Sequence, residues 1–212
     1  IREFGIPLFG LYGACSTMAE SLSLAAIMID GEYAKNTVAV TSSHFCSAER
    51  QFRFPLEYGT QRVPSAQWTV TGSGAVIIGK KRSHVRIAGI TTGKIVDMGV
   101  KDSMNMGACM APAAAEIIMQ HMKDFNAKPE DYDRIVTGDL GKVGQEILID
   151  LLLQKGINIE KQHMDCGIEI YDGATQDTHS GGSGCGCSAV VLSTLILKKI
   201  EEGIWKKVLL AF

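Results

Sequence analysis

Two segments of this 212-residue chain share one pattern: a cysteine–serine pair, an apolar helix-like stretch, a glycine and then a short apolar run. Gly31 closes the first stretch sixteen positions after Cys15, and Gly203 closes the second sixteen positions after Cys187. An aromatic residue and a lysine follow each glycine at matching distances, namely Tyr33, Lys35, Trp205 and Lys207. We infer that a strand–elbow–helix–strand unit occurs twice, 172 positions apart, which is the sign of an internal duplication.

Apolar runs alternate with helical patterns along the rest of the chain, which predicts an α/β layered fold. Strands are expected at 37–41, 68–79, 85–91, 134–137, 164–171 and 208–212, and helices at 16–29, 112–125, 144–154 and 188–202. Residues 44–68 are expected to form a loop. The close pair 68–79 and 85–91 resembles a hairpin, so we expect a mixed sheet.

The length of the repeat bears on the domain organisation. A whole protein of about twice the 172-residue separation would exceed the usual size of one domain. We therefore expect residues 1–100 to be the remainder of a first half and residues 101–212 to be most of a second half. The fold is then incomplete at both ends, because the first half lacks its start and Phe212 stands in an unfinished strand.

Composition excludes several classes of function. The formal net charge is −2 and no basic tract is present, so we expect no nucleic-acid partner. The apolar stretches are shorter than a membrane span, so no transmembrane segment is expected. The six cysteines form no CxxC pair, which favours a reducing compartment.

Three glycine-containing motifs carry a resemblance to a known superfamily. Residues 10–16 (Gly-Leu-Tyr-Gly-Ala-Cys-Ser) resemble the nucleophile elbow of thiolases and ketoacyl synthases. Residues 71–76 and 181–184 resemble that superfamily's glycine-rich strand and its second glycine turn. The resemblance implies a thiolase-like layered fold with internal duplication, in agreement with the repeat.

A closer resemblance is carried by residues 42–44, 48–55, 110–115 and 137–140, which are similar to the stage V sporulation protein AD family. The resemblance implies a non-catalytic thiolase-like protein that binds dipicolinic acid. It also implies joint action with other stage V sporulation proteins to move dipicolinate, as a calcium complex, into the developing spore. The implied location is the cytoplasmic side or the periphery of the forespore or spore inner membrane. Thiolase-like folds often dimerise through the first-half sheet, so a homodimer is a further expectation.

Catalysis by Cys15 is an alternative. A cysteine at a helix start feels the positive end of the helix dipole, and nearby N–H groups suit an oxyanion hole. A thiolate nucleophile also needs a base. Condensing enzymes supply a histidine from the loop that corresponds to residues 137–141 and an asparagine near the second glycine turn, and neither is present here. His179 could replace the base, although a surface role is favoured. The chain could therefore be an acyltransferase of the thiolase or ketoacyl-synthase class using Cys15, or a scaffold that docks membrane partners.

Dipicolinate is a planar pyridine with two carboxylates, so helix N-termini, hydroxyls and guanidinium groups should bind it. Arg50 and Arg53 suit the carboxylates, or they could pair with glutamates to fix their loop. Cys15 is expected to line the site, or to serve as a small buried side chain. The predicted ligand-binding residues are Cys15, Thr41, Ser42, Ser43, His44, Arg50, Arg53 and Ser183. No cofactor is expected, and no metal site: Cys185 and Cys187 could bind a soft metal, but packing is the favoured role.

Overall fold

A computed structural model of the chain describes residues 2–46, 63–81 and 83–212. The main helices are α1 (Thr17–Asp30), α2 (Met106–Asp124), α3 (Gly141–Leu153), α4 (Cys166–Glu169), α5 (Cys185–Val191) and α6 (Leu197–Glu201). The strands are β1 (Asn36–Ser43), β2 (Trp68–Thr69), β3 (Gly72–Gly79), β4 (Arg134–Thr137), β5 (His163–Asp165), β6 (Gly182–Ser183) and β7 (Val208–Ala211). This alternation confirms the predicted α/β class.

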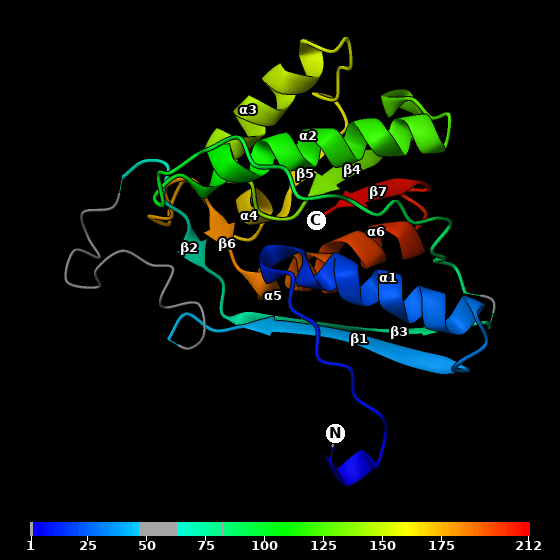
Figure 1. The fold of residues 1–212 in the computed structure, drawn as a ribbon. Helices are drawn as coiled ribbons and strands as arrows, with labels where there is room; N and C mark the ends of the chain where they lie inside the picture. The colour runs from blue at the N-terminus through cyan, green and yellow to red at the C-terminus, as the bar shows by residue number, and fades with distance from the viewer. Residues whose placement is uncertain (1, 47–62, 82) are drawn as a thin grey trace.

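The elements stack in alternating layers of helices and strands (Figure 1). The helices α2 and α3 form one outer layer above a sheet with the strand order β5-β4-β7. Below that sheet lie α1, α5 and α6, of which α1 and α5 pack on the antiparallel pair β1–β3. The two helices that follow the repeated cysteine–serine pairs, α1 and α5, therefore share the central layer and contact each other.

The sheet β5-β4-β7 forms the middle of the second half. Its pairs are parallel, and the side chains of Ile135 and Val136 on β4 are completely buried. The helices α2 and α3 cover one face and approach each other closely where Gly107 meets Gly144. A Cβ atom added to Gly107 would lie 2.5 Å from the carbonyl oxygen of Leu140, so this contact needs glycine.

The pair β1–β3 has one covered face and one exposed face. Ala39 and Thr41 are buried against the central helices, whereas Val38 and Val40 are 53% and 57% exposed. This alternation follows from the two-residue period of a strand. No described helix covers the exposed face, so this sheet is less protected from solvent than the sheet β5-β4-β7.

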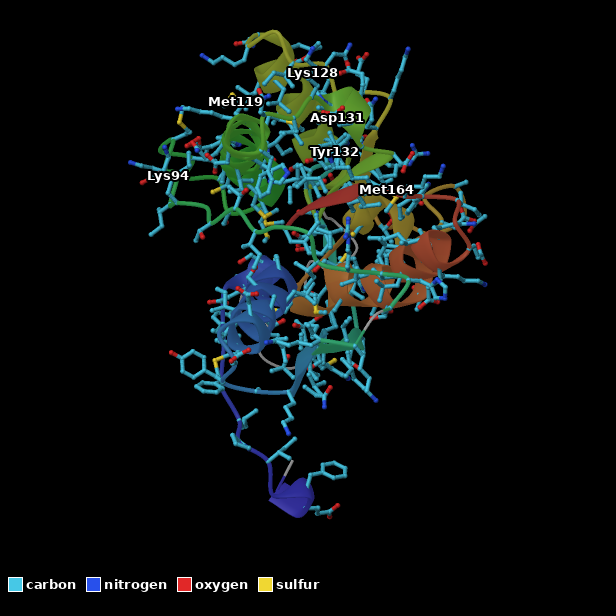
Figure 2. The ribbon with its side chains drawn as sticks, turned by 90° about the vertical axis from the view of Figure 1, so that its right-hand side faces the viewer. Lys94, Met119, Lys128, Asp131, Tyr132 and Met164 are labelled. Carbon is cyan, nitrogen blue, oxygen red and sulfur yellow. The ribbon has the colours of Figure 1, made fainter. Side chains whose placement is uncertain are left out.

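The prediction of a strand at residues 85–91 is wrong. This segment is not a strand, and it belongs to none of the sheets formed by the described residues. The segment instead runs along α2. Thr91 Oγ1 lies 2.8 Å from His121 Nδ1, and Lys94 pairs with Glu116. Figure 2 shows Lys94 and Met119 on this outer side of the molecule.

Local capping explains two further differences from the predicted elements. The helix expected from residue 112 begins at Met106, because the side chain of Asn105 accepts a hydrogen bond from the amide of Ala108. The strand expected at residues 164–171 ends at Asp165. The carboxylate of Asp165 accepts from the amide of Ile168 at 3.2 Å and so begins α4.

Candidate functional site

Cys15 stands on a tight elbow before α1. Ala14, which precedes it, has a φ of +50°, a conformation that L residues rarely adopt. The hydroxyl of Ser16 donates to the carbonyl oxygen of Gly13 at 2.6 Å and holds the turn. The partly buried thiol of Cys15 consequently points toward the second glycine turn, where its sulfur lies 3.9 Å from Ser183 Oγ.

Ser183 connects the thiol to a buried carboxylate. Its hydroxyl donates to Asp139 Oδ2 at 2.7 Å, and the amide of Gly184 donates to the same oxygen at 3.0 Å. Because the Ser183 proton is directed to Asp139, the Cys15 thiol is the donor toward Ser183 Oγ. The three side chains therefore form a row, Cys15–Ser183–Asp139, that joins the first half of the chain to the second.

The loop that carries Asp139 is held from two sides. The side-chain amide of Gln67 donates to the backbone oxygen of Asp139 at 2.6 Å and to that of Gly182 at 3.1 Å. On the other side, Asp165 accepts from the amides of Leu140 at 2.8 Å and Gly141 at 3.0 Å. The position of the Asp139 carboxylate is therefore fixed before any ligand arrives.

Asp165 is the structural partner of Asp139. Its side chain is 1% exposed and also accepts from Thr137 Oγ1 at 2.7 Å. Burial, reinforced by the charge of Asp139, raises the pKa of Asp165 to about 6, although hydrogen bonds from Thr137 and the loop amides oppose the rise. We assign it the role of fixing the loop and capping α4.

The electrostatics of the row act against a thiolate. Burial raises the pKa of the Cys15 thiol well above its ordinary value, and the charge of Asp139 raises it further. A hydrogen bond with Asp139 adds to the rise, and hydrogen bonding with Gly184 and Ser183 opposes it without reversing it. Cys15 is therefore held as a neutral thiol, which is the opposite of an activated nucleophile.

The family model of stage V sporulation protein AD (SpoVAD) matches residues 1–211. The chain belongs to the stage V sporulation protein AD family. It is 48% identical over 202 residues to stage V sporulation protein AD of Bacillus subtilis (strain 168), covering 95% of this chain and 60% of that protein. The chain thus spans less than two thirds of this curated relative. Membership of the SpoVAD family links the chain to sporulation.

Solved structures place this SpoVAD-family chain in the thiolase-like fold. The chain is similar to AbyA1, a tetronic acid condensing enzyme, with a TM-score of 0.57 and 14% identity, covering 92% of this chain and 61% of the other. It is also similar to 3-oxoacyl-[acyl-carrier-protein] synthase III from Aquifex aeolicus VF5, with a TM-score of 0.57 and 15% identity, covering 95% and 60%. These likenesses confirm the predicted partial thiolase-like fold.

Four of the predicted ligand-binding residues lie on β1 or directly after it, and their side chains have different surroundings. Ser43 is tied to α5, because its hydroxyl donates to the carbonyl oxygen of Val70 at 2.7 Å and accepts from the amide of Gly186 at 2.8 Å. Thr41 is buried, and Ser42 is exposed on the other face of the strand. His44 is exposed, and its Nδ1 accepts from the amide of Cys46 at 3.1 Å. Of the predicted ligand-binding residues, the structure brings Ser183 within 3.9 Å of the Cys15 sulfur.

Arg50 and Arg53 lie outside the described residues. His179, the candidate base, is engaged elsewhere: its Nδ1 lies 2.8 Å from the carbonyl oxygen of Val63 and its Nε2 lies 2.9 Å from Asp177 Oδ1. Both ring nitrogens of His179 therefore lie against oxygen atoms of Val63 and Asp177.

The sequence-based search missed Asp139, Gln67 and Asp165 as site residues. Asp139 follows β4 at the carboxyl end of a parallel strand, where α/β folds place ligands, and that position was a usable signal. Gln67 carried no comparable signal, because its contact with Asp139 spans 72 positions of the sequence.

Three further cysteines, one at the start of α4 and two on α5, lie in the interior of the described structure. The side chains of Cys166 and Cys187 are completely buried, and Cys185 is 8% exposed. Within residues 2–46, 63–81 and 83–212, no three histidine, cysteine or acidic side chains are grouped to hold a metal ion.

Proposed function

We propose that this SpoVAD-family chain forms the ligand site of a non-catalytic dipicolinate-binding protein, which serves the uptake of dipicolinate into the developing spore. The observation that carries this proposal is the row Cys15–Ser183–Asp139, in which a carboxylate stands where a thiol nucleophile would need a base. The family resemblance indicates which ligand is bound. The row of side chains favours a role for Cys15 in binding rather than in catalysis.

Acyl transfer is disfavoured by the charge of this row. A thiolate at Cys15 would lie beside the carboxylate of Asp139, and the two negative charges would repel each other. A histidine in that place would accept the proton and then pair with the thiolate as a cation. Asp139 carries no positive charge in either protonation state and so cannot pair with a thiolate in this way, which makes Cys15 better suited to line a ligand site than to attack a thioester.

The same carboxylate favours a particular form of the ligand. A free dipicolinate dianion would bring two negative charges toward the buried Asp139. The one-to-one calcium complex is neutral and presents a cation that compensates this charge. The proposal is therefore that the complex with calcium binds more tightly than dipicolinate alone.

Calorimetry on the purified full-length protein tests the proposal. We expect saturable heat with dipicolinate in the presence of calcium and weaker binding in its absence. Ser183→Ala removes the hydroxyl between Cys15 and Asp139 and should weaken binding about tenfold. Ser73→Ala is the control, because Ser73 is an exposed serine on the outer face of β3. No saturable heat at millimolar dipicolinate, with or without calcium, would refute the function.

A separate experiment tests the acyltransferase alternative. The protein is incubated with acyl-CoA and its intact mass is measured. We expect no acyl adduct on Cys15. A stoichiometric adduct that disappears in Cys15→Ala would support the enzyme instead.

Partners and location are part of the same proposal. We propose that the protein acts with other stage V sporulation proteins at the periphery of the spore inner membrane. In the described part of the chain, no helix has both the length and the apolar character that a bilayer span requires. Contact with the membrane would then pass through a partner protein, and co-purification from sporulating cells tests this.

A further inference from the structure

Three buried hydroxyl groups, those of Thr41, Thr69 and Ser188, have no hydrogen-bond partner among the described residues. Buried polar groups in folded proteins are nearly always hydrogen-bonded, so an exception calls for an explanation. Thr41 lies on β1, where its strand partner is Gly74, and Ser188 lies on α5, so neither is the strand partner of a residue in the row Cys15–Ser183–Asp139. Thr69 is different, because its strand runs beside Ser183.

The strand register places Thr69 next to Ser183. In the parallel pair β2–β6, Thr69 is the partner of Ser183, and the amide of Val70 donates to the carbonyl oxygen of Ser183 at 2.9 Å. Paired residues of neighbouring strands present their side chains on the same face of the sheet. The Thr69 and Ser183 side chains are therefore neighbours.

Two further contacts show which face this is. Gln67, two positions before Thr69 and hence on the same face, reaches the backbone oxygen of Asp139. The opposite face belongs to the hydrophobic core, because a Cβ atom added to Gly182 would meet Val70 and Ile170. Thr69 thus faces the Asp139 loop, on the side where Ser183 meets Asp139 and Cys15.

The protons of the neighbouring groups are already committed. Ser183 donates to Asp139, so its hydroxyl can only accept a further hydrogen bond. The Cys15 thiol is directed at Ser183. Thr69 is 1% exposed, and its hydroxyl, beside these groups, donates to no acceptor among the described residues.

We propose that Thr69 is a ligand-binding residue of this site, whose hydroxyl donates a hydrogen bond to a carboxylate oxygen of the ligand. The inference rests on the proposed dipicolinate function and adds a residue to it. The site then offers a donor at Thr69 and an acceptor at Ser183. A carboxylate ligand that holds a cation near Asp139 matches both the donor and the negative charge.

The test compares Thr69→Val, which keeps the shape and removes the hydroxyl, with Thr69→Ser, which keeps the hydroxyl. Dipicolinate binding is measured by calorimetry in calcium, and the unfolding of the ligand-free protein is measured in urea. Thr69→Val should bind about tenfold more weakly, while Thr69→Ser stays within about twofold of wild type. Because the hydroxyl has no partner in the free protein, Thr69→Val should be at least as stable as wild type. Thr194→Val, the same change on an exposed threonine, is the control.

The outcomes separate the two proposals. If wild type binds dipicolinate and Thr69→Val binds equally well, the role of Thr69 is refuted and the function stands. If Thr69→Val weakens binding but also destabilises the ligand-free protein, the hydroxyl has a structural partner and the inference is refuted. If wild type does not bind dipicolinate, the function fails and the role of Thr69 fails with it.

Discussion

The two repeated elbows differ in how tightly the rest of the protein surrounds them. Cys15 is partly buried, and Ala14 before it is exposed with a positive φ. Cys187 is completely buried, with its sulfur 3.8 Å from the carbonyl oxygen of Gly138. Gly186 before it is packed so closely that an added Cβ atom would lie 2.6 Å from the carbonyl oxygen of Gly72. One pattern in the sequence has therefore produced one open elbow and one packed elbow.

The packed elbow therefore bears on stability, and the open elbow bears on the candidate site. The packed elbow holds α5 against β1 and β3. The open elbow directs its thiol at Ser183 and Asp139, which belong to the second half. A duplicated unit can keep its fold in both copies while the two elbows differ in how closely they are packed.

Gly186→Ala should give the largest effect. The added methyl group would collide with the backbone of Gly72 and Ser43, which cannot move as a side chain can. We expect a loss of about 3 kcal/mol in the free energy of unfolding, measured in urea. The matched change at the open elbow, Ala14→Gly, should be neutral or stabilising by up to about 1 kcal/mol, because glycine tolerates the positive φ. Equal effects at both elbows would contradict the comparison.

The stability of the protein should also depend on pH, because of a histidine in the sheet β5-β4-β7. His163 on β5 lies 3.0 Å from Thr137 Oγ1, and its Nδ1 accepts from Gln145 Nε2 at 3.0 Å. Burial lowers the pKa of His163 to about 4.

Between pH 6.5 and 4 the unfolded chain takes up a proton at this histidine while the folded protein does not, so stability falls as the pH falls. Relative to His163→Gln, wild type should lose about 2 kcal/mol over this range, a value reduced because the ring is not fully buried. The exposed His84, changed to Gln, should leave the slope of wild type intact.

The charge of Asp139 should slow the alkylation of Cys15. Because Asp139 raises the pKa of the thiol, Asp139→Asn should increase the thiolate fraction and the rate with iodoacetamide about tenfold at pH 8. Peptide mass spectrometry follows each cysteine separately. The exposed Cys109 is the internal reference, and Asp150→Asn, on the exposed side of α3, is the control variant. An unchanged rate at Cys15 would mean that the carboxylate does not act on the thiol.

The smallest effect should come from replacing each elbow cysteine with serine. Cys187→Ser puts a hydroxyl into a completely buried place and should cost about 1 kcal/mol of stability. Cys15→Ser should change stability by less than about 0.5 kcal/mol, because this side chain is partly exposed. Urea denaturation of the two variants side by side measures the difference, and a reversed order would show that the first elbow is the packed one.

Sequence patterns predicted the helices and strands whose formation depends on residues close together in the chain. The apolar period and the closing glycine predicted α1, and a short apolar run predicted β4. The prediction failed at residues 85–91, where a strand-like composition pairs with none of the described strands and the segment contacts α2 instead. The start of α2 was missed because the side chain of Asn105 caps an earlier turn than Pro112 suggests.

By itself, the sequence determined the α/β class, the repeated elbow and the position of Cys15, because each rests on spacing within about one helix or strand. It also placed Ser183 in the candidate site. Only the tertiary structure decided what surrounds the thiol. The contact between Cys15 and Ser183 spans 168 positions, and that between Gln67 and Asp139 spans 72. Such contacts depend on how layers stack rather than on neighbours in the chain. That stacking also decided how closely each of two similar elbows is packed, because the second lies against the backbone of Gly72 and Ser43.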